Sequence, residues 1–255
     1  MSYYETFQIL EHPAWAQRFL RWCNGSVVRQ ILALSGKAHP RVLEIGPGKG
    51  YFFQALHSLC PEAHYVAVDE NRAILEHLGA KHVVQARIPG LPEFDDTFDI
   101  VYASYVIEHL ADGRALFAFL SACSRVLDVG GHIVLFAPDC LKQRMEFWNI
   151  DYTHSFPTTK RNVTLALLDA GFARVRTTDV SGQLTYPHFT NRALHACTRA
   201  LLCCYNYRLF SALCYPLSRR SAAAVDNIWY RFYCLAKQPT FMITAQKTVA
   251  GHDHE

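Results

Sequence analysis

RVLEIGPGKGYF, residues 41–52, joins a short apolar run to a glycine-rich turn and then to an aromatic segment with helical character. Gly46, Gly48 and Gly50 stand where a strand is expected to end and a helix to begin. Glycine marks turns of every kind, but it also lets a ligand approach the backbone closely, because it has no Cβ atom. The stretch therefore predicts either a plain turn or a binding loop, and the rest of the sequence has to decide between them.

The composition indicates one large globular α/β domain that carries an inserted segment. The chain has 255 residues, of which 51% are hydrophobic and 18% charged, so it can bury a full core. Its net charge of +3 is too small to indicate nucleic acid as a partner. Nine cysteines without a C-x-x-C pair or zinc-like spacing favour a reducing, cytoplasmic compartment. We expect neither a signal peptide nor a membrane-spanning helix.

Between residues 41 and 178, short apolar runs alternate with amphipathic stretches, as expected of strands joined by crossover helices. Several runs are apolar throughout, which is typical of a parallel sheet buried on both faces. The expected strands are Arg41–Ile45, Tyr65–Val68, Val83–Val84, Phe98–Ala103, His132–Ala137, Ala173–Thr177 and a final strand at 240–247. The expected helices of this region are Tyr51–Leu59, Arg114–Asp128 and a segment between Pro157 and Gly171.

Four segments follow from this pattern. We expect an N-terminal helical cap over residues 1–40, a ligand-binding core over 41–180, and a final core strand over 240–248. Residues 187–239 are expected to form a basic, amphipathic helical insertion before that strand. Between His188 and Gln238 there are seven basic residues and one acid, Asp226, interleaved with aromatic residues and leucines.

Asp69 raises the weight of the binding-loop interpretation. It ends the apolar run YVAV and lies 19 positions beyond Gly50, close to the spacing at which an acid receives ribose hydroxyls. The alternative is that Asp69 or Asn71 only caps the next helix. Tyr51 occupies the position where the dinucleotide fingerprint G-x-G-x-x-G requires glycine, and GKGY also lacks the Ser or Thr of a P-loop. A nicotinamide-dependent dehydrogenase is therefore disfavoured.

Five segments in order resemble motifs of the class I S-adenosylmethionine-dependent methyltransferases. They are VLEIGPGKGYF, YVAVDEN, FDDTFDIVYASYVIEHL, SRVLDVGGHIVLFAPD and LLDAGFARVR. Together with the last strand, the resemblance covers most of the chain outside its N-terminal segment and the insertion. It implies a doubly wound, Rossmann-like α/β fold with a seven-stranded sheet whose last strand is antiparallel. It also implies S-adenosyl-L-methionine as the cofactor.

The resemblance further implies a set of cofactor-binding residues. The glycine loop would line the methionine part, Glu44 would support this loop, and the acidic pair after the second strand would receive the ribose. Where the family often carries an acid near adenine, this chain has Arg87, so we expect the main chain of Ile88 to hold the adenine ring. The implied set is Glu44, Gly46, Pro47, Gly48, Gly50, Asp69, Glu70, Ile88, Ala103 and Ser104.

Two histidines are candidates for catalysis. Methyl transfer to a hydroxyl requires alignment and removal of a proton, and histidine titrates near neutral pH. His109 follows the fourth strand in VIEHL, and His154 lies in WNIDYTHSF after the fifth strand. We expect Asp151 to orient His154, and Tyr152 or Trp148 to floor the acceptor pocket. The alternative is that both histidines only stabilise loops. No spacing of His, Asp and Glu predicts a metal site.

The insertion over residues 187–239 has two interpretations. A basic amphipathic segment with aromatic residues suits an anionic membrane surface, whereas a lid or homodimer patch suits a small soluble acceptor. The sequence therefore predicts a methyltransferase of a hydroxyl, or less readily of carbon or nitrogen, on a small-molecule, sugar or lipid-linked acceptor. It is expected in the cytoplasm, free or peripheral to a membrane. The competing hypothesis is an inactive methyltransferase-like scaffold.

Overall fold

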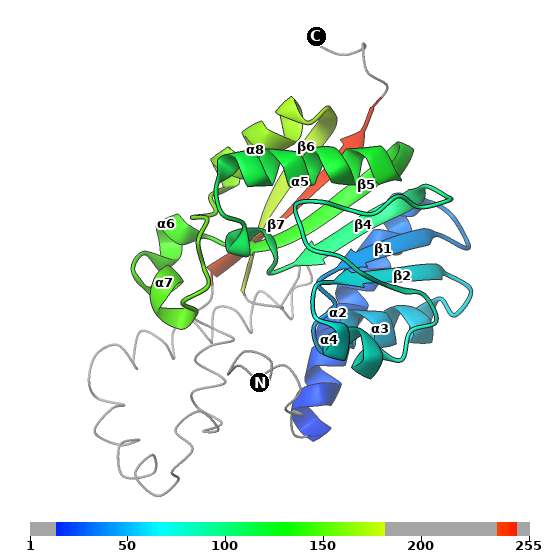
Figure 1. The fold of residues 1–255 in the computed structure, drawn as a ribbon. Helices are drawn as coiled ribbons and strands as arrows, with labels where there is room; N and C mark the ends of the chain where they lie inside the picture. Colours follow the sequence, from blue (N-terminus) through cyan, green and yellow to red (C-terminus); the bar gives the residue numbers. More distant parts are fainter. Residues whose placement is uncertain (1–13, 182–238, 249–255) are drawn as a thin grey trace, which may run out of the picture. The chain divides into compact units, whose positions relative to one another are not determined.

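The computed structural model describes residues 14–181 and 239–248, which contain a seven-stranded sheet with the order β3-β2-β1-β4-β5-β7-β6 (Figure 1). This is the predicted doubly wound α/β architecture. The strands are β1 (Arg41–Ile45), β2 (His64–Asp69), β3 (Val83–Gln85), β4 (Phe98–Ser104), β5 (Leu127–Pro138), β6 (Phe172–Ser181) and β7 (Pro239–Lys247).

The first five strands run parallel, and β7 runs against them. β1 pairs in parallel with both β2 and β4, so that Leu43 lies between Val66 and Val101. At the other side of the sheet, the amide of Gln246 and the ammonium of Lys247, at the end of β7, donate to main-chain carbonyls at the beginning of β5. The end of one strand beside the start of its neighbour is the arrangement of an antiparallel pair, which confirms the predicted last strand.

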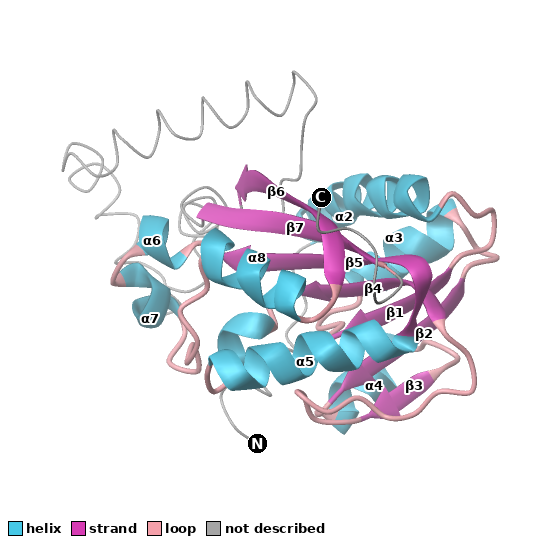
Figure 2. Cartoon of the chain, turned by 90° about the horizontal axis from the view of Figure 1, so that it is seen from above, coloured by secondary structure: helices cyan, strands magenta, loops and turns pink. Residues whose placement is uncertain are grey.

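The helices cover both faces of the sheet. α2 and α3 pack against each other on one face, and α5 and α8 pack together on the other (Figure 2). Apolar side chains of α5 and α8 form one core with the strands, and α2 and α3 also bury apolar side chains. The described helices are α2 (Ala14–Ser35), α3 (Tyr51–Leu59), α4 (Arg72–Leu78), α5 (Gly113–Val126), α6 (Cys140–Gln143), α7 (Glu146–Ile150) and α8 (Lys160–Asp169), with a 3-10 turn, η1 (Ile107–His109).

Polar side chains begin three of these helices. The Asn71 side chain accepts the amide hydrogen of Ala73 at α4, and the Asp112 carboxylate accepts that of Ala115 at α5. Thr159 caps α8 in the same manner. Each cap satisfies an amide that has no partner within its helix. The helix starts are therefore encoded locally, which is why patterning alone placed α5 and α8 within a few residues.

The chain divides into two compact units, residues 1–178 with 241–255, and residues 179–240. The first unit holds α2, which packs on α3 and contacts β4 and β5. The insertion expected over residues 187–239 lies almost entirely outside the described residues. None of the described helices is both long enough and apolar enough to cross a membrane. The four described cysteines all carry free thiols.

Strand direction determines where a site can lie. β1, β2, β4 and β5 are parallel, so their carboxyl ends meet at one edge of the sheet, where open α/β sheets bind ligands. The glycine loop follows β1, the acidic pair follows β2, η1 follows β4, and the segment with α6 and α7 follows β5. The sheet thus brings all the predicted site segments to the same edge.

Candidate functional site

The glycine loop between β1 and α3 needs its glycines for two different reasons. All three have positive φ angles, 70° at Gly46, 50° at Gly48 and 71° at Gly50. A Cβ atom at Gly46 would lie 2.7 Å from the Val106 side chain, and one at Gly50 would lie 2.7 Å from the Leu78 side chain. A larger residue at either position would force the contacted side chain to shift, in addition to the strain of a positive φ.

Gly48 differs from the other two glycines. A Cβ atom built at this residue meets no other atom within 4 Å among the described residues. The loop therefore leaves open space at Gly48, at the edge of the sheet where a ligand is expected. The positive φ alone favours glycine at this position, and the open space beside it leaves room for a bound cofactor.

Glu44 lies in β1 directly below this loop and is 3% exposed. The Tyr65 hydroxyl of the neighbouring strand donates a hydrogen bond to its carboxylate. Burial raises the pKa of Glu44 to about 8, with a smaller contribution from the negative charge of Asp69. The carboxyl group is therefore largely neutral near pH 7, and it would ionise when a cationic ligand approaches.

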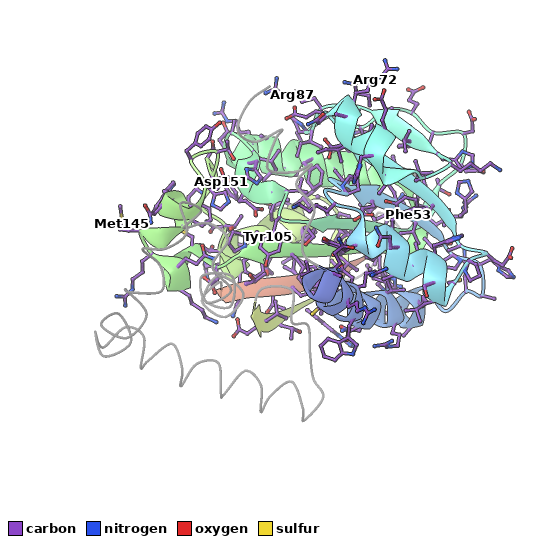
Figure 3. The ribbon with its side chains drawn as sticks, turned by 90° about the horizontal axis from the view of Figure 1, so that it is seen from below. Phe53, Arg72, Arg87, Tyr105, Met145 and Asp151 are labelled. Atoms are coloured by element: carbon purple, nitrogen blue, oxygen red, sulfur yellow. The ribbon has the colours of Figure 1, made fainter. Side chains whose placement is uncertain are left out.

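Asp69 ends β2 and is not the cap of α4, because Asn71 performs that role. One carboxylate oxygen of Asp69 accepts the amide hydrogen of Asn71 at 2.8 Å, and burial raises the pKa of the group. The next residue, Glu70, is paired with Arg87 at 3.3 Å. The Arg87 side chain is 84% exposed and lies at the outer surface (Figure 3). The arginine in the loop after β3 is thus paired, at the surface, with an acid of the loop after β2.

Three further predicted cofactor residues occupy this edge of the sheet. Ala103 is buried near the end of β4, and Ser104 is half-buried as its last residue. Tyr105 follows with a φ of 56° and donates its amide hydrogen to Phe136 of β5. This bond fixes the exit of the chain from β4. Ile88 lies in the loop after β3, partly exposed, and its contact with adenine stays a prediction.

The two candidate histidines lie together, although 45 positions separate them in the sequence. The ring centroids of His109 and His154 are 5.1 Å apart, with the planes inclined at 61°. The main-chain amides of Ser155 and Phe156 both donate to the Glu108 carbonyl, at 2.9 and 3.0 Å. These two bonds attach the His154 loop to the η1 turn, so the histidine pair has a defined geometry.

Hydrogen bonds also select the tautomer of each ring. The Thr153 hydroxyl donates to Asp151 at 2.7 Å, so it can only accept from His109 Nδ1, which lies 2.8 Å away. His154 Nδ1 donates to the Phe147 carbonyl at 2.6 Å. In the neutral form both rings therefore carry their lone pair on Nε2. Burial, and then the charge of His154, lower the pKa of His109, which favours this neutral form.

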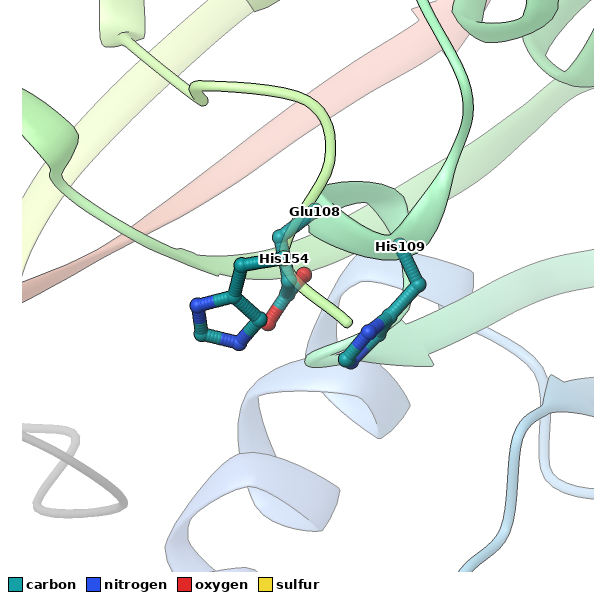
Figure 4. A group of neighbouring side chains, drawn as sticks. All are labelled: Glu108, His109 and His154. Carbon is teal, nitrogen blue, oxygen red and sulfur yellow. The ribbon is translucent and has the colours of Figure 1, made fainter. Parts of the chain in front are cut away.

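Glu108 is the residue that the sequence interpretation missed. Its side chain is 0% exposed, and neither carboxylate oxygen has a hydrogen-bond partner among the described residues. One oxygen of Glu108 and one ring nitrogen from each of His109 and His154 all lie within 4.8 Å of one another. Figure 4 shows the three side chains gathered on one side of η1. Only the adjacent histidine in VIEHL could have drawn attention to this glutamate.

The Asp151 side chain does not orient His154 as expected. Asp151 receives the amide and hydroxyl of Thr153 and so acts on His109, while a main-chain carbonyl orients His154. Tyr152 and Trp148 are 81% and 44% exposed among the described residues, and their place in an acceptor pocket stays a prediction. The error arose because sequence adjacency suggested a partner for His154, whereas the turn directs the carboxylate toward the other histidine.

One of the two histidines, His109, lies close enough to the loop after β2 to be affected by its charge. The negative charge of Glu70, after β2, acts on His109 and favours its protonated form, although burial outweighs this effect. The predicted acceptor side and the predicted ribose side thus belong to one region of the sheet edge. The arrangement combines a glycine-lined space, carboxyl groups at strand ends, and two neighbouring imidazoles.

Comparison with known proteins agrees with this geometry. Residues 14–177 match a family model described as a methyltransferase domain. A probable S-adenosylmethionine-dependent methyltransferase of Mycobacterium tuberculosis is 31% identical over 143 residues, which cover 52% of this chain and 49% of the relative. A malonyl-[acyl-carrier protein] O-methyltransferase of Legionella pneumophila is 30% identical over 125 residues, which cover 45% and 43%. The chain thus spans about half the length of these relatives.

A solved structure shows the same fold at lower sequence similarity. The S-adenosylmethionine-dependent methyltransferase of Archaeoglobus fulgidus superposes with a TM-score of 0.58 and is 20% identical. The alignment covers 96% of this chain and all of that one. At this identity the likeness concerns the arrangement of strands and helices.

Proposed function

The chain belongs to the class I S-adenosylmethionine-dependent methyltransferases, and from this premise we propose that it methylates a hydroxyl group of a small-molecule, sugar or lipid-linked acceptor. When bound, S-adenosyl-L-methionine supplies an electrophilic methyl group. The residues on the sheet edge support this cofactor, because Gly48 borders open space and two acids, Glu44 and Asp69, lie at or near the ends of neighbouring strands. The family relationship makes the chain an S-adenosylmethionine-dependent enzyme.

The paired histidines are the observation that carries the choice of acceptor. An oxygen acceptor must lose a proton, and His154 has an Nε2 lone pair in the tautomer fixed by the Phe147 carbonyl. We assign His154 as the proton acceptor and His109 as the residue that orients the hydroxyl beside it. The name of one relative, an O-methyltransferase, is in keeping with an oxygen acceptor. A neutral amine would be the competing acceptor class.

Replacement of His154 tests this proposal. We expect His154→Ala to lower kcat about 100-fold or more, the usual contribution of a general base, with unchanged affinity for S-adenosyl-L-methionine. Turnover is followed as S-adenosylhomocysteine formed with a panel of phenols, sugars and polyprenyl phosphates. His39→Ala is the matched control, because His39 is exposed just before β1, at the opposite end of the strands. Full activity of His154→Ala would refute the assignment.

The basic residues between positions 188 and 238 give a second, independent proposal about the acceptor. Seven cationic side chains against one acid suit a phosphate-bearing molecule, since arginine binds phosphate in a bidentate manner. Such a phosphate could belong to a lipid-linked acceptor in a membrane or to a soluble acceptor. Sedimentation of the full chain with anionic vesicles distinguishes these two cases. Salt-sensitive sedimentation supports a lipid-linked acceptor at a membrane surface, and its absence supports a lid over a soluble one. The homodimer stays a prediction that sedimentation velocity tests.

The competing hypothesis of an inactive, methyltransferase-like scaffold makes the opposite prediction. It expects cofactor binding without turnover of any acceptor in the panel. Arg87, the sequence feature that supports this hypothesis, forms an exposed ion pair with Glu70. Any acceptor-dependent formation of S-adenosylhomocysteine excludes the scaffold.

A further inference from the structure

Glu108 has a buried carboxyl group that nothing in the described part of the chain satisfies. Leaving such a group without a hydrogen-bond partner costs free energy, and an ionised carboxylate costs much more. Most buried acids in folded proteins are paired or bind a metal. Here both oxygens lack a partner while two imidazoles stand beside them. A ligand that binds carboxylate oxygens as well as nitrogen lone pairs would remove this free-energy cost of burial.

We propose that Glu108, His109 and His154 form a binding site for a divalent transition-metal ion of the zinc class. One carboxylate oxygen and one nitrogen from each imidazole would be the ligands, and these three atoms lie within 4.8 Å of one another. Donor atoms around a tetrahedral zinc ion lie roughly 3.3 Å apart, given bonds of about 2.0–2.1 Å. Closing the site thus requires the three donor atoms, now within 4.8 Å of one another, to move toward each other by about 1.5 Å at most.

The hydrogen bonds around the histidines have the form that metal sites require. A ligand histidine normally donates its second ring nitrogen to a carbonyl, a carboxylate or another acceptor, which fixes the ring and its tautomer. His154 donates Nδ1 to the Phe147 carbonyl, and His109 donates Nδ1 to the Thr153 hydroxyl, which in turn donates to Asp151. Both rings thus present Nε2 with its lone pair.

The donor types select the class of ion. Two imidazoles with one carboxylate suit zinc and its neighbours, while magnesium and calcium prefer sites made only of oxygen atoms. Three protein ligands also leave a coordination position open, as in catalytic zinc sites. The proposal of a metal site depends only on this geometry and on the donor types, and not on the identity of the methyl acceptor.

Metal binding has one consequence that does rest on the proposed function. A nitrogen that coordinates an ion cannot accept a proton, so a bound ion occupies the atom assigned to remove the acceptor's proton. We therefore expect zinc to inhibit methyl transfer, and a chelator to restore it. If the chelator instead abolishes turnover, the metal site stands and the assignment of His154 as the base fails. The two proposals can thus fail separately.

Titration of the full chain with Zn²⁺ and Co²⁺, after treatment with a chelator, tests the site directly. The tail histidines are first replaced in the background variant His252→Ala/His254→Ala, so that they cannot contribute ligands. Calorimetry is expected to show one ion per chain, and the visible spectrum of the Co²⁺ form should lack thiolate charge-transfer bands. Glu108→Gln and His154→Ala should each weaken binding at least tenfold, while His39→Ala should leave it unchanged.

Thermal unfolding of Glu108→Gln distinguishes a ligand from a structural residue. In the presence of chelator we expect this variant to unfold at the same temperature as the parent or higher. The substitution removes a buried carboxyl group that has no hydrogen-bond partner among the described residues. Zinc should raise the unfolding temperature of the parent and not that of the variant. The proposal is overturned if the parent binds no stoichiometric ion, if Mg²⁺ binds in preference to Zn²⁺, or if Glu108→Gln retains binding.

Discussion

At the scale of single residues, the site combines positions that the sequence marks with positions that only folding reveals. Gly48 and Asp69 follow strands and could be identified from spacing, because strand, turn and helix signals are local. Glu108 could not, because its burial depends on the loop after β5 closing over η1 through two main-chain bonds. Thr153 was missed for the same reason, since its hydroxyl connects residues from both segments.

Gly48 provides the first residue-scale prediction. We expect Gly48→Val to lower the affinity for S-adenosyl-L-methionine at least tenfold, because the added side chain enters the open space of the loop. The measurement is calorimetric titration. Gly36→Val is the matched control, since Gly36 also has a positive φ, 61°, and an added Cβ there would meet no atom within 4 Å, but Gly36 precedes β1. Both variants should lose about 1–2 kcal/mol or more from backbone strain.

Unchanged cofactor affinity in Gly48→Val would show that the open space is not the binding site. Equal loss of affinity in Gly36→Val would show instead that backbone strain alone is responsible. The two variants thus separate steric exclusion from a general loss of stability.

Glu44 provides a prediction about pH. Its pKa is about 8 in the folded protein against 4.5 as the ordinary value, so the unfolded chain releases this proton first. The carboxyl group's contribution to stability is fully present below pH 4.5 and is lost progressively as pH rises to about 8. The loss amounts to about 1.4 kcal/mol per pH unit at most. Tyr65, Asp69 and Tyr102 are the groups that interact with it.

Urea unfolding of the parent and of Glu44→Gln at pH 5.5, 7 and 8.5 checks this expectation. The free energy of unfolding of the parent should fall relative to that of the variant as pH rises. Comparing the two proteins removes the contribution of every other titrating group. Parallel pH profiles would mean that Glu44 is ionised in the folded protein.

At the scale of elements, helix starts were predictable because polar caps lie beside apolar periodic stretches. Arg114–Asp128 was expected, and α5 occupies Gly113–Val126. The fifth strand was underestimated, since β5 begins at Leu127, directly after α5, and not at His132. Its first residues include Gly130 and Gly131, which are typical of a turn. Pairing of Leu127 with Phe98 in the neighbouring strand overrides that local preference.

The cap of α5 gives an element-scale prediction. Asp112→Ala should lower the free energy of unfolding by about 1 kcal/mol, because the amide of Ala115 loses its acceptor. Asp112→Asn is the control, since its carbonyl oxygen can accept the same hydrogen bond. Urea unfolding measures both changes. If the asparagine variant loses as much as the alanine variant, the carboxylate acts through its charge and not as a cap.

At the scale of the whole molecule, strand order and direction bring four loops to one edge, and five motifs in sequence order were sufficient to predict this. The order of the motifs could not predict which side chains of these loops contact one another at that edge. The meeting of His109 and His154 depends on the length and turn geometry of the segment after β5. Asp151 was therefore given to the wrong histidine, although both histidines were correctly selected as neighbours of the sheet edge.

Cofactor binding should stabilise the molecule as a whole. At a concentration 100 times the dissociation constant, S-adenosyl-L-methionine should add about 2.7 kcal/mol to the free energy of unfolding. For a chain of this size the melting temperature should rise by roughly 5–10 °C. Differential scanning calorimetry measures the shift, and Gly48→Val should show little of it at the same concentration. A comparable shift with NAD would contradict the selectivity expected from Tyr51.

The position of β1 between β2 and β4 also has a consequence for how the protein is made. Val42 pairs with Ile100, 58 residues later, so one edge of this buried strand stays uncovered while the ribosome adds the intervening chain. At about 5–20 residues per second this interval lasts roughly 3–12 s. During it, the apolar strand offers unpaired amides and carbonyls to other chains. One edge of β5 stays unpaired for longer still, because its neighbour β7 begins only at Pro239. The nascent chain is therefore more open to association with other chains than its finished sheet suggests, and slower translation lengthens this interval.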